Sequence, residues 1–75
     1  MNSEQIMKEL ELYVDRELEE TKKYAEVKED VIHARNRAFG AVTFACYICP
    51  EVYKNIDEFW NNGKLDEFND ILNSL

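Results

Sequence analysis

Residues 31–50 of this 75-residue chain read VIHARNRAFGAVTFACYICP. Apolar residues recur in this segment at helical spacing on two adjacent stripes, so it predicts a helix with a wide buried face. The members of this series are Val31, Ile32, Ala34, Ala38, Phe39, Ala41, Val42, Ala45, Cys46, Ile48 and Cys49. Glycine inside a helix costs about 1 kcal/mol relative to alanine, and we expect a close contact with a neighbouring helix to offset this cost at Gly40. Pro50 ends the helix, because proline disfavours helical backbone at the residue before it.

The residues before this segment predict another helix. No glycine or proline precedes Gly40, and Asn2 and Gln5 have the spacing of a capping box at a helix start near Ser3. Apolar residues then follow at helical spacing at Ile6, Leu10, Tyr13, Val14 and Leu18.

The charged stretch Glu19–Asp30 separates the two apolar series and leaves two alternatives. Either the chain turns near Glu26–Asp30 to form a helical hairpin, or one helix runs from Ser3 to about Ile48. A heptad series crosses the stretch without a register break, which favours the long helix; it comprises Tyr24, Val27, Val31, Ala34 and Ala38. A helix of about 45 residues would be about 68 Å long and would need a second chain beside it. We therefore prefer the hairpin and keep the long helix as the alternative.

The last third of the chain predicts two short helices. Proline is suited to the first position of a helix, and the stripe after Pro50 consists of Val52, Ile56, Phe59 and Trp60. Asn61-Asn62-Gly63 predicts the end of that helix, with Gly63 in the left-handed capping conformation. A final helix is marked by Leu65, Phe68, Leu72 and Leu75. The predicted fold is all-α: one domain over residues 1–75, a small bundle in which a helical hairpin, or one long helix, precedes two short C-terminal helices.

The charge balance argues against several classes of partner. The chain has 9 basic and 16 acidic residues, a net charge of −7, and both of its halves are acidic. Direct binding of nucleic acid is not expected, because that affinity rests mainly on basic residues that contact phosphates. The longest uncharged run, residues 38–50, is shorter than the roughly 18 residues that span a bilayer. The first residues lack the basic and apolar regions of a secretion signal, so we expect a cytoplasmic protein with reduced cysteines and no membrane association.

Cys46 and Cys49 form a C-x-x-C pair, a spacing found in redox dithiols and in zinc sites. The pair lies at the C-terminal end of a predicted helix, where the dipole disfavours a thiolate. Beyond the pair, His33 is the only other nitrogen or sulfur ligand, so a four-thiolate site would need a second chain. We expect both cysteines to pack as small apolar residues, and a metal or redox site remains the second alternative function.

No other pattern points to chemistry. His33 is expected on a charged helix surface, and no serine lies near it in the sequence. Neighbouring carboxylates on a helix point about 100° apart, so they do not converge on a substrate. We therefore expect no enzyme, no catalytic residues, no cofactor, no metal and no small-molecule substrate.

Phe44 and Tyr47 lie off the buried stripe of their helix, which makes that helix apolar nearly all round and predicts a second buried surface. Single cores below about 80 residues supply only about 3–5 kcal/mol, so self-association would help such a chain. We expect a protein–protein interaction module, a homodimer or a binder of another protein, whose interface includes Phe44, Tyr47, Tyr53 and Trp60. The alternative is an acidic regulator that uses the Glu17–Asp30 face to occupy a basic nucleic-acid-binding site on another protein.

Overall fold

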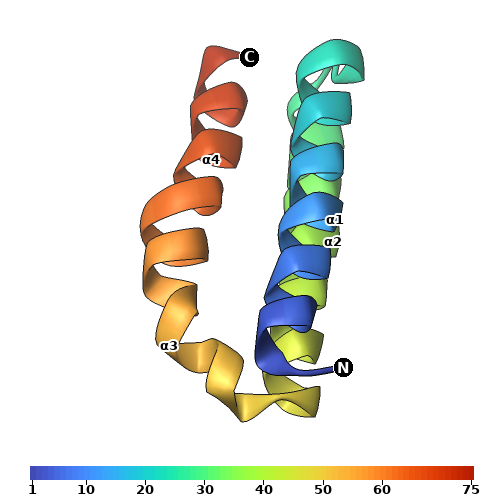
Figure 1. Cartoon of the computed structure of the whole chain (residues 1–75). Helices are drawn as coiled ribbons and strands as arrows, with labels where there is room; N and C mark the ends of the chain where they lie inside the picture. Colours follow the sequence, from blue (N-terminus) through green and yellow to red (C-terminus); the bar gives the residue numbers. More distant parts are fainter.

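The computed structural model describes all 75 residues, and these are helical apart from the termini and the connecting turns. Helix α1 (Ser3–Tyr24) is followed by α2 (Lys28–Ile48), which runs back beside it as a helical hairpin (Figure 1). The chain then continues through a 3-10 turn, η1 (Pro50–Val52), and a winding C-terminal segment composed of α3 (Tyr53–Ile56), the π-helical η2 (Asp57–Lys64) and α4 (Leu65–Ser74). That segment packs along the hairpin. The all-α prediction is confirmed.

Helix α1 begins at the predicted capping box. The Asn2 side chain accepts a hydrogen bond from the backbone N–H of Gln5 at 2.9 Å, and the Gln5 side chain accepts one from the backbone N–H of Asn2 at 3.0 Å. Each bond satisfies a donor that the first helical turn leaves unpaired. The helix ends after Tyr24, because Ala25 takes an extended backbone conformation.

The hairpin, and not the long helix, is the observed structure. The carboxylate of Asp30, in the first turn of α2, accepts hydrogen bonds from the backbone N–H groups of Glu26 at 2.9 Å and Val27 at 3.3 Å. These bonds hold the turn and supply acceptors to donors at the start of the helix. The long-helix alternative is therefore wrong. Tyr24 and Val27 continue the heptad series through this region, but both side chains are exposed. The apolar spacing there therefore does not correspond to a buried helix face.

The core lies where the hairpin meets the C-terminal segment. Small residues of α2, among them Ala34 and Ala38, are buried in this core, to which the C-terminal segment contributes Trp60 and Phe68. The buried apolar cluster consists of Met7, Leu10, Val14, Leu18, Val31, Ala34, Ala38, Val42, Ala45, Cys46, Val52, Trp60 and Phe68. None of the helices combines the length and the apolar character needed to cross a membrane.

The C-terminal segment is one long helical stretch with a kink at Asn62, which is where the sequence predicts the boundary between two short helices. Backbone winding continues through Asn61-Asn62-Gly63, where only Asn62 departs from helical angles, at φ −110° and ψ 16°. No glycine has a positive φ, so the predicted left-handed cap at Gly63 is wrong. In a regular α-helix, residues eight apart such as Trp60 and Phe68 would point roughly 80° apart. The kink at Asn62 lies between the two residues, and both side chains are buried.

The two glycines have different surroundings. A Cβ atom on Gly63 would lie 2.7 Å from the carbonyl oxygen of Glu58, so only glycine fits this wide turn without a shift of the backbone. A Cβ atom on Gly40 would meet nothing within 4 Å. The close helix contact predicted at Gly40 is therefore absent, and Gly40 faces solvent.

Candidate interaction surface

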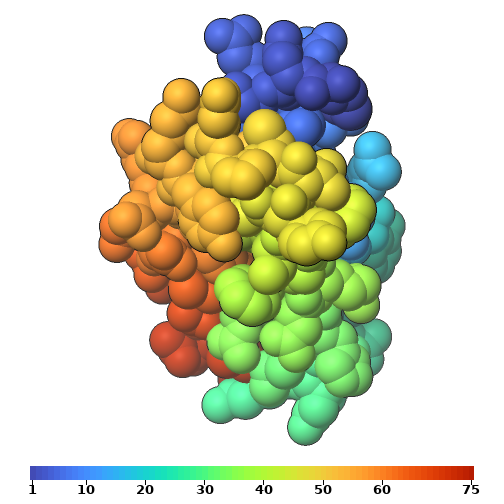
Figure 2. Space-filling view, turned by 90° about the horizontal axis from the view of Figure 1, so that it is seen from below, coloured from blue at the N-terminus to red at the C-terminus, as the bar shows by residue number.

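The outward surface of the second half of α2 carries two large aromatic side chains. Phe44 is 62% exposed and Tyr47 is 84% exposed, so the prediction that both point away from the core is confirmed. Residues three apart on a helix lie about 60° from each other, which places the two rings on one side of α2. We call this surface the α2 outer face, and it comprises Gly40, Thr43, Phe44, Tyr47 and Ile48. Figure 2 views the molecule from the end at which α2 gives way to the turn at Pro50. The chain around Pro50 (yellow) is seen there next to the start of α1 (blue) and the residues after α3 (orange).

The α2 outer face has no charged side chain, and the hydroxyl group in its middle, that of Thr43, is hydrogen-bonded within the helix. No charged residue occurs between residues 38 and 50, although the chain has a net charge of −7. The Thr43 hydroxyl donates its hydrogen bond to the backbone carbonyl of Phe39 inside the helix. The nearest cation towards the start of α2 is Arg37, whose guanidinium lies 3.0 Å from the Glu17 carboxylate on α1. A partner could therefore cover this face without burying an unpaired charge.

The other two predicted interface residues are not on this face. Tyr53 is exposed but belongs to α3, beyond the turn at Pro50. Trp60 is only 1% exposed, and its ring centroid lies 6.2 Å from that of Phe39 and 6.0 Å from that of Phe68. The prediction that Trp60 contacts a partner is therefore wrong, because the domain needs this side chain for its own core.

Two exposed residues were predicted to be buried. Phe39 is more than half exposed and packs at the edge of Trp60, and Ile48 is 52% exposed beside Phe44. A signal for Ile48 was present in the sequence. Ile48 comes seventeen residues after Val31, which places it about 100° from the direction of the buried stripe on a helical wheel.

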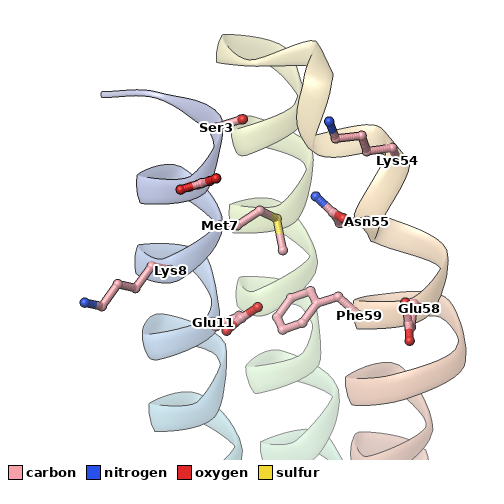
Figure 3. Close-up of a pocket in the computed structure, with 9 residues that line it drawn as sticks. Ser3, Met7, Lys8, Glu11, Lys54, Asn55, Glu58 and Phe59 are labelled. Atoms are coloured by element: carbon pink, nitrogen blue, oxygen red, sulfur yellow. The ribbon is translucent and has the colours of Figure 1, made fainter.

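A groove of about 600 Å³ separates the first turns of α1 from the start of the C-terminal segment (Figure 3). Its apolar lining is limited to Met7 and Phe59. Lys8, Glu11, Lys54 and Glu58 are among the polar residues along its rim, and Lys8 points away from the groove. The polar groups thus do not converge on one point. In sites that recognise a small ligand, a few polar groups do converge.

The two cysteines have unequal environments. Cys46 is buried in the core, Cys49 is half-buried, and both are free thiols. Burial raises the pKa of the Cys46 thiol, which keeps it protonated and unreactive at neutral pH. No group of three or more His, Cys, Asp or Glu side chains is arranged to hold a metal ion.

Alkylation tests this difference between the cysteines. In the folded protein, iodoacetamide is expected to modify Cys49 at least about tenfold faster than Cys46, because the thiolate is the reactive form and burial suppresses it at Cys46. Peptide mass spectrometry after timed quenching measures the two rates. In denaturant the rates should become similar. Faster modification of Cys46 in the folded protein would contradict the packing role and support a reactive dithiol.

Part of the acidic Glu17–Asp30 face is used within the chain. Glu17 pairs with Arg37, and Glu19 lies 3.4 Å from Lys22. The backbone N–H groups of Glu26 and Val27 hold the pKa of the Asp30 carboxyl below its usual value. These three carboxylates therefore hold the helices and the hairpin turn, which leaves fewer of them free to contact a basic partner.

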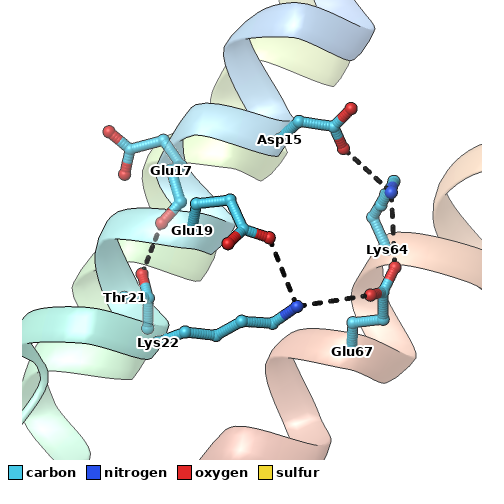
Figure 4. Close-up of polar contacts among 7 residues, drawn as sticks. All are labelled: Asp15, Glu17, Glu19, Thr21, Lys22, Lys64 and Glu67. Carbon is cyan, nitrogen blue, oxygen red and sulfur yellow. Dashed lines mark hydrogen bonds and ion pairs between the residues drawn. The ribbon is translucent and has the colours of Figure 1, made fainter.

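Lysine side chains link α1 to the C-terminal segment (Figure 4). The ammonium of Lys64 lies 2.8 Å from the Asp15 carboxylate and 3.4 Å from that of Glu67, and Lys22 lies 3.9 Å from Glu67. The hydrogen bond to Asp15 is the main reason why the pKa of Lys64 is raised, and the negative charges of Asp15 and Glu67 add to it. The network helps to fix the C-terminal segment against the hairpin.

The substitution Lys64→Met is expected to lower the free energy of unfolding by about 0.5–1 kcal/mol at neutral pH, the range of partly exposed ion pairs. Because the folded-state pKa of Lys64 is raised, its contribution is complete below the usual lysine pKa of 10.5 and is lost as the pH rises through the folded value. Urea titrations across this range should therefore show the wild type converging on the variant. Lys54→Met is the control, because Lys54 makes none of these ion pairs. A difference that persists unchanged at strongly alkaline pH would contradict this role.

Comparison with known proteins assigns no family to this arrangement of helices and exposed aromatics. No protein-family model, no curated protein and no solved structure matches the chain.

Proposed function

We propose that this chain is a small helical protein–protein interaction module that associates with a second copy of itself through the α2 outer face. The observation that carries the proposal is the exposure of Phe44 and Tyr47, at 62% and 84%, on a helix face without charge. Aromatic side chains are enriched in the centres of protein interfaces, and charged side chains are depleted there.

The α2 outer face permits a second copy as the occupant, because it is an uncharged part of an acidic chain. Two chains that each have a net charge of −7 repel each other over most of their surfaces. The α2 outer face is a place where two copies can meet without bringing carboxylates together. Added salt screens the remaining repulsion, so this association should not weaken as the ionic strength rises.

Removal of either aromatic ring is expected to weaken self-association. Tyr47→Ala and Phe44→Ala should each raise the dimer dissociation constant by about 30-fold, the equivalent of about 2 kcal/mol for an interface hot spot. Sedimentation equilibrium measures the constant, and far-UV circular dichroism should show unchanged helicity because both side chains lie outside the core.

Tyr24→Ala provides the matched control. Tyr24 is also a highly exposed aromatic residue, but it lies at the hairpin turn, at the other end of α2 from Tyr47. Its removal should leave the dissociation constant unchanged. Equal effects of the three substitutions, or no effect of Tyr47→Ala and Phe44→Ala, would contradict the proposal, and a loss of helicity would place the two rings in the core.

The alternative of an acidic regulator has less support, because Glu17 and Asp30 already bind groups of the same chain. It differs sharply in its salt dependence. Binding to a basic partner through carboxylates should collapse as salt is raised, whereas self-association through the α2 outer face should persist.

A further inference from the structure

We propose that Asn62 is a site of spontaneous deamidation, and that the isoaspartate product loosens α4 from the hairpin. The site is the pair Asn62-Gly63 at the kink of the C-terminal segment, where Asn62 alone departs from helical angles. The pair lies outside the α2 outer face, so the reaction does not depend on self-association.

Asparagine is a thermolabile residue, because the backbone nitrogen of the next residue can attack its side chain. Here the nitrogen of Gly63 attacks the side-chain carbonyl carbon of Asn62 and a C–N bond forms. The amide nitrogen leaves as ammonia and takes up the proton of the Gly63 N–H. Water then opens the resulting succinimide ring at either carbonyl group. One opening gives aspartate, and the other gives isoaspartate, in which the main chain runs through the former side chain.

The fold requires the neighbour that favours this reaction most. Glycine has no side chain to obstruct its backbone nitrogen, and Asn62 is the only asparagine of the chain that precedes a glycine. Gly63 is required in its turn, because a Cβ atom there would lie 2.7 Å from the carbonyl oxygen of Glu58. The close backbone approach at Gly63 therefore places the least hindered nucleophile directly after Asn62.

The side chain and backbone of Asn62 are poorly restrained. Its side chain is exposed and makes no hydrogen bond within the chain, whereas the amide of Asn61 donates to the Asp57 carboxylate at 2.7 Å. Ring closure requires rotation away from the observed ψ of 16°. At a kink this rotation disturbs less regular structure than it would inside α2, where Asn36 lies.

The isoaspartate product changes the length of the main chain. It adds a carbon atom to the backbone directly before Gly63, in a turn that has no room for an atom beside the Glu58 carbonyl oxygen. Gly63 and the residues after it must then shift. The buried side chain of Phe68 and the ion pair between Lys64 and Asp15 hold α4 in its place, so this shift weakens the contact between α4 and the hairpin.

Timed incubation of the purified chain at physiological temperature and mildly alkaline pH tests the site. The chain is digested at acidic pH, where succinimide formation is slow, and mass spectrometry with electron-transfer fragmentation distinguishes isoaspartate from aspartate. In the folded chain we expect Asn62 to deamidate at least about fivefold faster than Asn36 or Asn73, which are also exposed. Asn62→Gln should abolish the main product, and Asn73→Gln should leave it. Deamidation of Asn62 no faster than that of Asn73 would overturn the proposed site.

Unfolding of the isolated isoaspartate form tests its effect on α4. We expect its ratio of folded to unfolded chain to be at least about tenfold below that of the unmodified chain at the same urea concentration. Asn62→Asp is the matched control, because it adds the carboxylate without the additional main-chain atom. Its ratio should fall less, through repulsion from Glu58 and Asp66 four residues away on either side. Equal unfolding of the isoaspartate form and Asn62→Asp would contradict the loosening of α4.

Discussion

Trp60→Ala is expected to unfold most of the chain at room temperature. Trp60 is 1% exposed and packs against Phe39 and Phe68. Truncation of a buried phenylalanine or tryptophan to alanine typically costs about 3–5 kcal/mol. A single core of this size supplies only about 3–5 kcal/mol in total, so the loss consumes nearly all of the stability. Far-UV circular dichroism and urea titration measure the result.

Tyr53→Ala is the control for this prediction. Tyr53 is an exposed aromatic residue seven positions earlier, and its removal should change the free energy of unfolding by less than about 0.5 kcal/mol. A folded Trp60→Ala variant with wild-type stability but reduced self-association would show that Trp60 contacts a partner, and it would contradict the burial of Trp60 in the core.

Gly63→Ala and Gly40→Ala are expected to change stability in opposite directions. At Gly63 the added Cβ would lie 2.7 Å from the Glu58 carbonyl oxygen, and because this atom belongs to the backbone the helix itself must shift. Overpacking of this kind costs about 1–3 kcal/mol. At Gly40 the space is open, so alanine should stabilise the helix by about 1 kcal/mol.

Urea unfolding of the two alanine variants measures this difference, at a protein concentration where light scattering gives the monomer mass. The comparison is internal, because both variants make the same chemical change within a helix. A stabilised Gly63→Ala variant would show that the π-helical turn does not depend on glycine. A destabilised Gly40→Ala variant would show a contact at Gly40 within the monomer.

Much of the fold was predictable because local chemistry determines it. The Asn2–Gln5 capping box and the helical spacing of the apolar residues depend on neighbours a few positions away. The capping box is confirmed, and most of the stripe in α1 is buried or half-buried, but Tyr13 on that stripe is exposed and Met7 outside it is buried. The hairpin was harder to predict, because the heptad series ran through the turn without interruption. In the turn, the Asp30 carboxylate accepts hydrogen bonds from two backbone N–H groups, which a continuous helix would not offer to it.

The C-terminal segment and Trp60 were predicted less well because tertiary packing overrode the local signals. Asn-Asn-Gly usually ends a helix, but here it coincides with a kink at Asn62 between the buried Trp60 and Phe68, and Gly63 makes a close backbone approach to Glu58. Of the four predicted interface residues, Phe44 and Tyr47 share one face, Tyr53 is exposed on another helix, and Trp60 is buried. Helical spacing placed the first two correctly. Aromatic character alone could not separate core from surface in the others.

The solution mass of the wild-type chain tests the central claim most directly. Light scattering coupled to size-exclusion chromatography, at two protein concentrations and at low and high salt, is the measurement. We predict twice the monomer mass of 8.9 kDa at the higher concentration, and no loss of the dimer at high salt. A mass of 8.9 kDa under all four conditions would contradict self-association through the α2 outer face.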